Sequence, residues 1–252
     1  MQTYYHSLAP FRDLFQTGAP ILTYHKLGPR PNGVRLKGLY LSETLFTRQL
    51  GELHRAGFTT STLSEVLSPD KNLPRRITIT FDDGFRNVLH FGLTPLRTFQ
   101  FHAILFLVAD LIGRTNEWEQ RECEARELLM DQAQVREWLA AGHEIGSHTC
   151  THPFLARLST HRASEEITAS RKKIEDLFGV PVEHFCYPYG EWNETLRDLV
   201  ADAGYKTACT TEPGVNGPAD SRLALKRFTA RYPSRNLKVI WSRLRRRTRS
   251  KV

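Results

Sequence analysis

The chain has 252 residues, of which 40% are apolar and 25% are charged; this balance is that of a globular protein and excludes a disordered or fibrous one. A chain of this length can form one α/β barrel or two small domains, and a single domain is the simpler interpretation. We expect the basic C-terminal tail to be solvated, with peripheral contact to a membrane as the alternative, and we expect no specific nucleic-acid partner. Most of the formal net charge of +8 comes from that tail, which holds Arg243, Arg245, Arg246, Arg247, Arg249 and Lys251.

The cysteine spacing and the N-terminal region bear on the compartment. Cys123, Cys150, Cys186 and Cys209 are widely separated and form no C-x-x-C pair, so we expect reduced thiols rather than a zinc ribbon or a thioredoxin-type motif. The N-terminal region has no basic stretch followed by an apolar one, and no apolar run is as long as a membrane span. The sequence therefore predicts a cytoplasmic protein, with a peripheral location at the membrane left open through the basic tail. It does not indicate an oligomeric state.

Short β-rich runs alternate with segments of helical period, which predicts βα units and a mostly parallel sheet. In chain order, we expect strands near 19–25, 58–62, 76–81, 103–108, 143–147, 183–187 and 206–210, and an eighth near 223–228. Between them, apolar faces that end at a glycine predict helices over 43–56, 135–141, 160–178 and 194–203. Residues 110–128 are charged without a clear apolar face, and we expect an irregular surface loop there.

Two adjacent carboxylates, Asp82 and Asp83, follow the predicted strand 76–81 where it emerges into a loop. Burying them without a cation would be costly. Adjacent residues at a strand end point in different directions, so one carboxylate can bind a metal while the other faces a water on that metal. The alternative is an ordinary strand-to-helix turn with a capping aspartate.

Two histidines four residues apart, His148 and His152, follow the predicted strand 143–147, and one turn of chain brings both to one cation. Two histidines and one carboxylate suit Zn²⁺ and leave a position for water, which is the pattern of a catalytic site, since a structural site would have four protein ligands. Each motif alone is more often an ordinary loop. Both lie at the C-terminal ends of predicted barrel strands, however, where the active sites of such barrels collect.

Four motifs occur in a fixed order along the chain: TFDDG at 80–84, GHEIGSH at 142–148, HTCTH at 148–152 and YPYG at 187–190, preceded by Tyr24 and His25 on the first strand. In this order they resemble the polysaccharide deacetylases of the NodB-homology type, carbohydrate esterase family 4. The resemblance implies a distorted (β/α)7 barrel as a single domain over 19–232. It leaves 1–18 as an N-terminal extension and 233–252 as a basic C-terminal helix or tail.

The same resemblance implies a reaction and a set of residues for it. The reaction is the hydrolysis of an N-acetyl group on a carbohydrate, and the cofactor is a divalent metal, with Zn²⁺ as first choice. The metal is held by Asp83, His148 and His152, while Asp82 is the base that takes a proton from water. The resemblance assigns the backbone N–H of Tyr189 to the oxyanion, together with the metal.

The chain departs from many members of this family at Cys186, which stands where they have an arginine next to the catalytic aspartate. Without that cation we expect the pKa of Asp82 to be higher, unless another basic residue compensates. We interpret Cys186 itself as a small buried residue rather than a nucleophile, because no motif supplies a paired base.

A second departure concerns the acid that protonates the leaving amine. No histidine follows His184, so the late leucine-x-histidine motif of many relatives is missing. Our candidate is His25, which ends the first predicted strand and therefore faces the rim of the metal site; the alternative is a structural histidine. Trp192, close to Tyr189, is expected either to stack on a sugar ring or simply to pack.

The leading hypothesis is thus a metal-dependent enzyme that deacetylates a polysaccharide or glycoconjugate containing N-acetylglucosamine. A catalytically degenerate barrel that binds glycan without turnover is one alternative; Cys186 and the missing late histidine favour it, and the intact metal set with Asp82 opposes it. The other is a metal-dependent amidase acting on a non-sugar substrate, since this metal chemistry does not itself require a sugar.

Overall fold

A single parallel sheet forms the centre of the molecule in the computed structural model, which describes residues 6–67, 75–122 and 124–230. Within these ranges the strand order is β10-β1-β5-β6-β7-β8-β9, and β4 also pairs with β5. The strands are β1 (Ile21–Tyr24), β4 (Thr59–Thr60), β5 (Arg76–Phe81), β6 (Ile104–Leu107), β7 (Glu144–Ser147), β8 (His184–Cys186), β9 (Thr207–Cys209) and β10 (Phe228–Thr229). Most of their residues are buried, as expected for a parallel sheet covered by helices.

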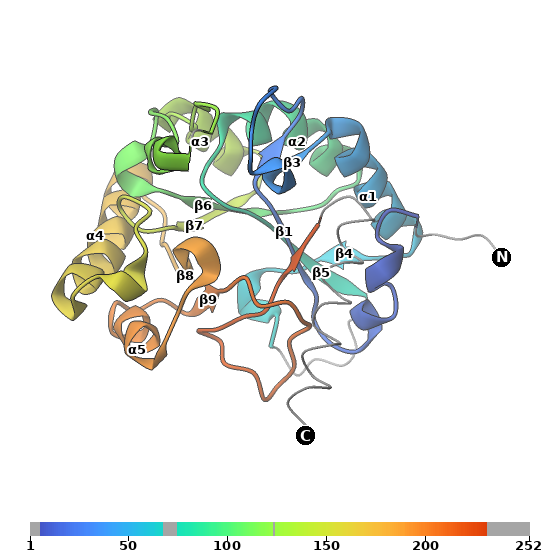
Figure 1. Cartoon of the computed structure of the whole chain (residues 1–252). Coiled ribbons are helices and arrows are strands. Elements are labelled where there is room, and N and C mark those ends of the chain that lie inside the picture. Colours follow the sequence, from blue (N-terminus) through green and yellow to red (C-terminus); the bar gives the residue numbers. More distant parts are fainter. Residues whose placement is uncertain (1–5, 68–74, 123, 231–252) are drawn as a thin grey trace, which may run out of the picture.

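The two edges of the sheet are brought together by the segment before β10. Leu225 forms a parallel bridge with Cys209 at the end of β9, and its backbone N–H donates to the carbonyl of Ala208 over 2.8 Å. The sheet therefore curves into a distorted barrel, and Figure 1 shows β10 lying beside β1 at the seam. The predicted barrel and the seven predicted strands are confirmed; the eighth is displaced to Phe228–Thr229, because 222–225 pairs only loosely with β9.

Within the described ranges, five α-helices surround the strands on the outside (Figure 1). They are α1 (Glu43–Arg55), α2 (Arg86–Thr98), α3 (Gln132–Ala140), α4 (Thr160–Phe178) and α5 (Glu194–Asp202). Four begin at a residue whose side chain accepts a hydrogen bond from the first turn, namely Ser42, Asp131, Ser159 and Asn193, which satisfies backbone donors at the helix start. The helices predicted from glycine-terminated apolar faces are therefore present at their predicted positions.

Shorter elements complete the described chain. Strands β2 (Lys26–Leu27) and β3 (Tyr40–Leu41) form a small parallel pair beside the barrel, and two residues are too few to give a period that the sequence could reveal. The 3₁₀-helices are Ala9–Phe11, Leu14–Gln16, Lys37–Leu39, Leu63–Glu65, Ala109–Leu111, Glu117–Glu122, Leu155–Arg157 and Pro188–Gly190. Among the described residues, no helix has both the length and the apolar character needed to cross a membrane.

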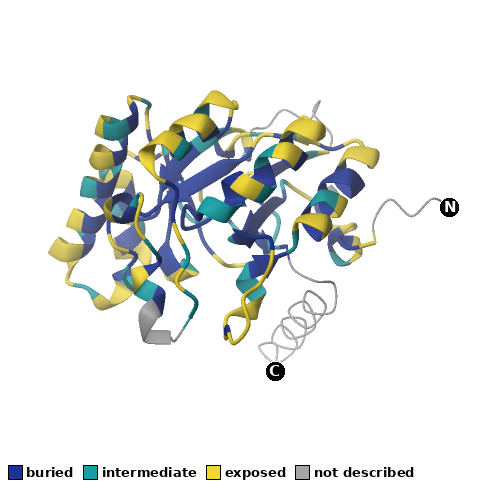
Figure 2. Cartoon of the chain, turned by 90° about the horizontal axis from the view of Figure 1, so that it is seen from above, coloured by how far each residue is buried: buried dark blue, intermediate teal, exposed yellow. Residues whose placement is uncertain are grey.

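The main core lies between the sheet and its helices, with the exposed residues confined to the outer faces of the helices and the loops (Figure 2). Leu8, Phe11 and Phe15, from the described part of the N-terminal extension, are 0%, 3% and 3% exposed and belong to this same core. Residues 6–18 therefore pack as part of the barrel domain. The tail expected at 233–252 lies outside the described residues.

The charged stretch predicted to be a surface loop packs against the barrel instead. Residues 113–129, here called the 113–129 segment, return to the sheet side through an antiparallel bridge between Leu129 and Phe85. Within it, Asn116 and Glu119 are 2% and 5% exposed. The interpretation of 110–128 as a surface loop is therefore wrong at Asn116 and Glu119, because the charge of Glu119 is buried against Lys26. Most of the other described residues of this stretch are exposed or half-buried.

Candidate active site

The polar residues singled out by their motifs meet at one end of the barrel. They stand directly after three strands of the sheet, with His25 after β1, Asp82 and Asp83 after β5, and His148 after β7, which β6 separates from β5. The carboxyl ends of parallel barrel strands share one rim, where the connecting loops build active sites. Here that rim encloses a cavity of about 930 Å³ to which all four residues contribute, a size within the range of small-molecule sites.

Three residues of this rim form a compact ligand set. The Nε2 atoms of His148 and His152 lie 3.3 and 3.4 Å from the same carboxylate oxygen of Asp83. All three side chains are buried, and their ligand atoms lie within 4.8 Å of one another. Three donors that converge on one point, two imidazoles and a carboxylate, have the composition of a catalytic metal site with an open position.

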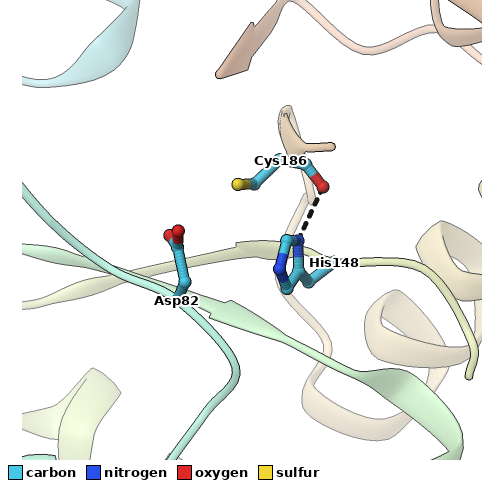
Figure 3. A group of neighbouring side chains, drawn as sticks. All are labelled: Asp82, His148 and Cys186. Atoms are coloured by element: carbon cyan, nitrogen blue, oxygen red, sulfur yellow. Dashed lines mark hydrogen bonds between the residues drawn. The ribbon is translucent and has the colours of Figure 1, made fainter. Parts of the chain in front are cut away.

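His148 is oriented by the next strand. Its Nδ1 lies 2.7 Å from the backbone carbonyl of Cys186, to which it donates, so Nε2 is the ring nitrogen that faces Asp83. Figure 3 shows this contact, and shows the Cys186 thiol turned away from the imidazole and toward Asp82. A hydrogen bond from the second ring nitrogen to a carbonyl is the usual way in which proteins fix a metal-binding histidine.

The loops that carry the site adopt strained backbone conformations. Asp83, Thr149, His152 and Tyr189 all have φ between 59° and 75°, in the left-handed region that non-glycine residues rarely occupy. Such residues cost on the order of 1–3 kcal/mol each and persist where surrounding contacts hold them. Because these residues gather around the cavity, contacts in the surrounding structure must offset their strain and hold their side chains in place.

Glu166, on α4, supplies one of those holding contacts. Its buried carboxylate accepts hydrogen bonds from the backbone N–H groups of Cys150 and Thr151 over 2.9 and 3.0 Å, and from the Thr151 hydroxyl over 2.7 Å. The loop between His148 and His152 is thereby tied to a helix. The sequence offers no signal for this role, since a glutamate on an amphipathic helix ordinarily faces solvent.

Asp82 is paired with an arginine that the motifs do not contain. The guanidinium of Arg227 donates to both carboxylate oxygens of Asp82, over 2.7 and 2.8 Å, and it is completely buried. It also donates to the carbonyl of Thr210 and lies 3.2 Å from the thiol of Cys186. Another basic residue therefore compensates for the arginine that is missing at position 186, and it reaches the carboxylate from the residue before β10. The higher pKa expected for Asp82 in the absence of that arginine is not found.

These contacts set the ionisation of the two aspartates. Burial raises the pKa of Asp82, but the charges of Arg227 and His25 and the hydrogen bonds from Arg227 outweigh it, so that the net pKa lies below its ordinary value. Burial likewise raises the pKa of Asp83, and the hydrogen bonds from His148 and His152 together hold it well below the usual range. Both carboxylates are therefore ionised at neutral pH.

His25 faces the same site from β1. Its Nε2 lies 3.6 Å from a carboxylate oxygen of Asp82, and its side chain is 17% exposed to the cavity. Burial lowers the pKa of His25, and the neighbouring Asp82 and Asp83 raise it by less, so that the net pKa lies below that of an ordinary imidazole. The structure thus brings the candidate acid to the candidate base.

The aromatic residues around the cavity differ from the sequence-based choice. Tyr189 lines it and stacks on Phe154 with ring centroids 3.7 Å apart and planes 5° apart, and Arg157 lies over the Phe154 ring. Trp118, from the 113–129 segment, also lines the cavity. Trp192 is half-buried against the core, and its indole N–H donates to Glu212 over 3.1 Å; it is not among the described residues that line the cavity.

The sequence profile of the polysaccharide deacetylase family matches residues 70–208. This match covers more than half of the chain, includes both aspartates and both histidines of the ligand set, and contains strands β5 to β8 of the barrel. The chain therefore belongs to the polysaccharide deacetylase family.

Individual relatives agree with this family. YxkH of Bacillus subtilis (strain 168), which carries a polysaccharide deacetylase name, is 26% identical over 82% of this chain and 70% of its own length. The peptidoglycan-N-acetylglucosamine deacetylase PgdA of Listeria monocytogenes is 25% identical over 52% of this chain and 25% of its own length. The deacetylase PplD of Streptococcus pyogenes, solved in complex with acetate, superposes with a TM-score of 0.73 at 22% identity, over 87% of this chain and 96% of PplD. That likeness shows the shared fold.

Proposed function

We propose that the protein removes N-acetyl groups from a carbohydrate by metal-dependent hydrolysis. The observation that carries this proposal is the placement of two functional units side by side in one cavity. The first is the ligand set of Asp83, His148 and His152; the second is the carboxylate of Asp82 with its buried partner Arg227. Hydrolysis of an amide at a metal site needs a ligand set with an open position and a separate base next to it.

The ligand set fits a divalent metal, with Zn²⁺ as the first choice. Its three side chains converge from the loops after two different strands, and the Nδ1 of His148 is already engaged by a carbonyl so that Nε2 is aimed at the site. When bound, the metal supplies the Lewis acidity that lowers the pKa of a water and polarises the acetyl carbonyl. Asp83, His148 and His152 hold it by one oxygen and two nitrogens.

Asp82 is proposed as the base that accepts the proton of the attacking water. Its lowered pKa keeps it ionised at neutral pH. A carboxylate offers about four acceptor positions, so the two hydrogen bonds from Arg227 fix its orientation and still leave positions that face the cavity. Arg227 therefore acts through Asp82 by holding it in place.

His25 is proposed as the acid that donates a proton to the leaving amine. The position of His25 supports this role, because it lies beside Asp82 in the cavity wall and on the rim that carries the ligand set. Because burial lowers the pKa of His25, its imidazolium form is favoured only on the acid side of neutrality. The backbone N–H of Tyr189 is proposed as a donor to the oxyanion, supported by the position of Tyr189 in the cavity wall.

A carbohydrate is the substrate class that the cavity supports best. Besides the ionised residues, its wall contains the rings of Trp118, Phe154 and Tyr189, and aromatic rings combined with a few polar groups are typical of sites that bind sugars. The relative PgdA is named for deacetylating N-acetylglucosamine in peptidoglycan, which makes N-acetylglucosamine the first sugar to try. Trp192 remains a candidate for stacking on a substrate that extends beyond the cavity.

The two alternatives gain less from the structure. A degenerate barrel was favoured by Cys186, but Arg227 supplies Asp82 with the cation that Cys186 does not. A non-sugar amide would use the same ligand set, and nothing in the described cavity favours it over a sugar.

Acetate release tests the proposal directly. N-acetylglucosamine oligomers of several linkages and a non-sugar acetamide are incubated with the protein after removal of metal, and after addition of Zn²⁺ or Co²⁺. We expect acetate from the oligomers only when metal is present. Release without metal, or from the acetamide alone, would contradict the proposal.

Variants of the ligands and the base separate their roles. His148→Ala or His152→Ala removes one of three metal ligands, so both tight metal binding and turnover should be lost. Asp82→Asn should bind metal normally and turn over about 10²–10⁴ times more slowly, because only the base is missing. Metal content by atomic spectroscopy and acetate release distinguish the two outcomes; full activity in Asp82→Asn would assign the base to another group.

A further inference from the structure

The two histidines of the ligand set are held in different ways. The Nδ1 of His148 donates to the carbonyl of Cys186. The Nδ1 of His152 is also buried, yet it has no hydrogen-bond partner among the described residues. A metal-binding histidine normally has such a partner, which fixes the ring and whose loss weakens metal binding. Some other contact must orient the ring of His152.

That contact is Trp118. Its ring stacks on the imidazole of His152, with centroids 4.6 Å apart and planes inclined by 26°. On another side, the ring of Tyr189 meets the same imidazole at 4.7 Å and 69°. A planar ring placed against the imidazole face restricts its rotation, because turning the ring would break the stacked contact.

Trp118 is followed in sequence by Glu119, which belongs to a buried ionic cluster. The ammonium of Lys26, on β2, is completely buried and lies 2.6 Å from the carboxylate of Glu119. The side-chain amide of Asn116 donates to the same oxygen over 2.6 Å, and its carbonyl accepts from the backbone of Glu127. Charges buried in this way are costly unless paired, so the cluster specifies one position for the segment.

We propose that Trp118 is a positioning residue for the metal ligand His152, and that the Lys26–Glu119–Asn116 cluster holds it there. Stacking thus does for His152 what the carbonyl of Cys186 does for His148. The inference rests on the proposed metal site, and it assigns to the 113–129 segment a part in metal binding.

Metal affinity tests the inference without recourse to activity. The dissociation constant for Zn²⁺ is measured by competition with a chromogenic chelator. Trp118→Ala and Trp118→Leu should each weaken binding by about 10–100-fold, as loss of a supporting contact to a ligand does. Trp118→Leu keeps apolar bulk, so that it should fold even if Trp118→Ala does not. Trp118→Phe keeps an aromatic face and should retain most of the affinity.

Phe99→Ala is the matched control. Phe99 is an aromatic residue that lies against His54, a histidine outside the ligand set, with ring centroids 5.6 Å apart. This variant loses an aromatic–histidine contact elsewhere in the fold and should bind Zn²⁺ as the unaltered protein does. Equal weakening in Phe99→Ala and Trp118→Leu would mean that the effect is one of general stability, and would overturn the inference.

A second measurement reports the contact itself. Because Trp118 lies against a ligand, Co²⁺ binding should quench the intrinsic fluorescence, and Trp118→Phe should lose most of that quenching while Trp192→Phe keeps it. Unchanged Zn²⁺ affinity in a folded Trp118→Leu variant would overturn the inference and leave the proposed function intact. Failure of the unaltered protein to bind Zn²⁺ would instead contradict the proposed function.

Discussion

At the scale of single residues, the positive charge beside Asp82 comes from Arg227 and not from position 186. The Nη2 atom of Arg227 lies 3.2 Å from the Sγ atom of Cys186, although Cys186 ends β8 and Arg227 precedes β10. The guanidinium therefore occupies the space beside Asp82 that a longer side chain at 186 would need. The small, uncharged thiol leaves room for it, and its own pKa is raised by burial to about 11, so it adds no charge.

Arg227→Gln should move the acid limb of the pH–rate profile upward. Asp82 has a lowered pKa, so it stays ionised, and contributes to stability, until the pH falls through that lowered value. Without Arg227, only the charges of His25 and His148 oppose the effect of burial on this pKa, so protonation sets in at a higher pH. Arg227→Lys keeps a charge but not the paired hydrogen bonds, so its acid limb should lie between those of the unaltered protein and Arg227→Gln. Measurement of kcat/KM against pH decides; three coincident acid limbs would mean that Arg227 does not tune Asp82.

His25→Gln should lower turnover strongly and leave metal content and folding unchanged. If His25 is the acid, the proton it donates is lost as pH rises through its lowered pKa, so the alkaline limb of the unaltered protein should lie below that of an ordinary imidazole. The limb should disappear in the variant. A variant that keeps most of its activity, with the same alkaline limb, would make His25 a structural residue of the rim.

At the scale of elements, the turn Pro188–Gly190 joins the wall of the cavity to the loop after β9. Gly190 has φ of 74°, and a Cβ there would overlap both the side chain and the backbone of Thr211. The hydroxyl of Thr211 in turn donates to the carbonyl of Tyr189 over 3.3 Å. The placement of Tyr189 therefore depends on a close approach that only glycine allows.

Gly190→Ala should destabilise the protein more than Gly33→Ala and should also reduce turnover. Gly33 has φ of 83°, but a Cβ added there would meet no described atom within 4 Å, so its substitution costs left-handed strain alone, about 1–2 kcal/mol. Gly190→Ala adds the overlap with Thr211 and displaces Tyr189. Thermal unfolding and kcat of the two variants test this, and equal effects on both quantities would refute it.

The elements also show what the sequence could and could not predict. The sequence alone could predict the two aspartates and the two histidines of the site, because each pair lies within one short motif directly after a strand. These residues are Asp82, Asp83, His148 and His152. Arg227 was not, because it is 145 residues from Asp82 and lies beyond the region that the family profile matches. The role of the 113–129 segment was hidden for another reason: its charges indicate solvent unless their buried partner, here Lys26 on a two-residue strand, is known.

At the scale of the whole molecule, the described N-terminal residues share a core with the barrel. Phe15 is 3% exposed and contacts the rings of Phe58 and Phe228, which come from distant parts of the chain. Phe15→Ala should therefore destabilise the protein by about 3–5 kcal/mol, as large-to-small changes in a core do. Leu14→Ala, at an exposed neighbouring position, is the control. Chemical denaturation gives both values, and equal values would mean that the extension folds apart from the barrel.

The pairing of Arg227 with Asp82 has a consequence for the order in which the enzyme matures during synthesis. The residues proposed as metal ligands and base have all been synthesised once the ribosome has passed His152, but Arg227 comes only just before β10, the last strand among the described residues. A chain that stops before Arg227 carries the carboxylate of Asp82 without its counter-charge. Competence for hydrolysis should thus appear late and abruptly, when β10 docks beside β1. Release of acetate by truncated chains that end just before and just after this part of the chain, measured once they have left the ribosome, would reveal that step.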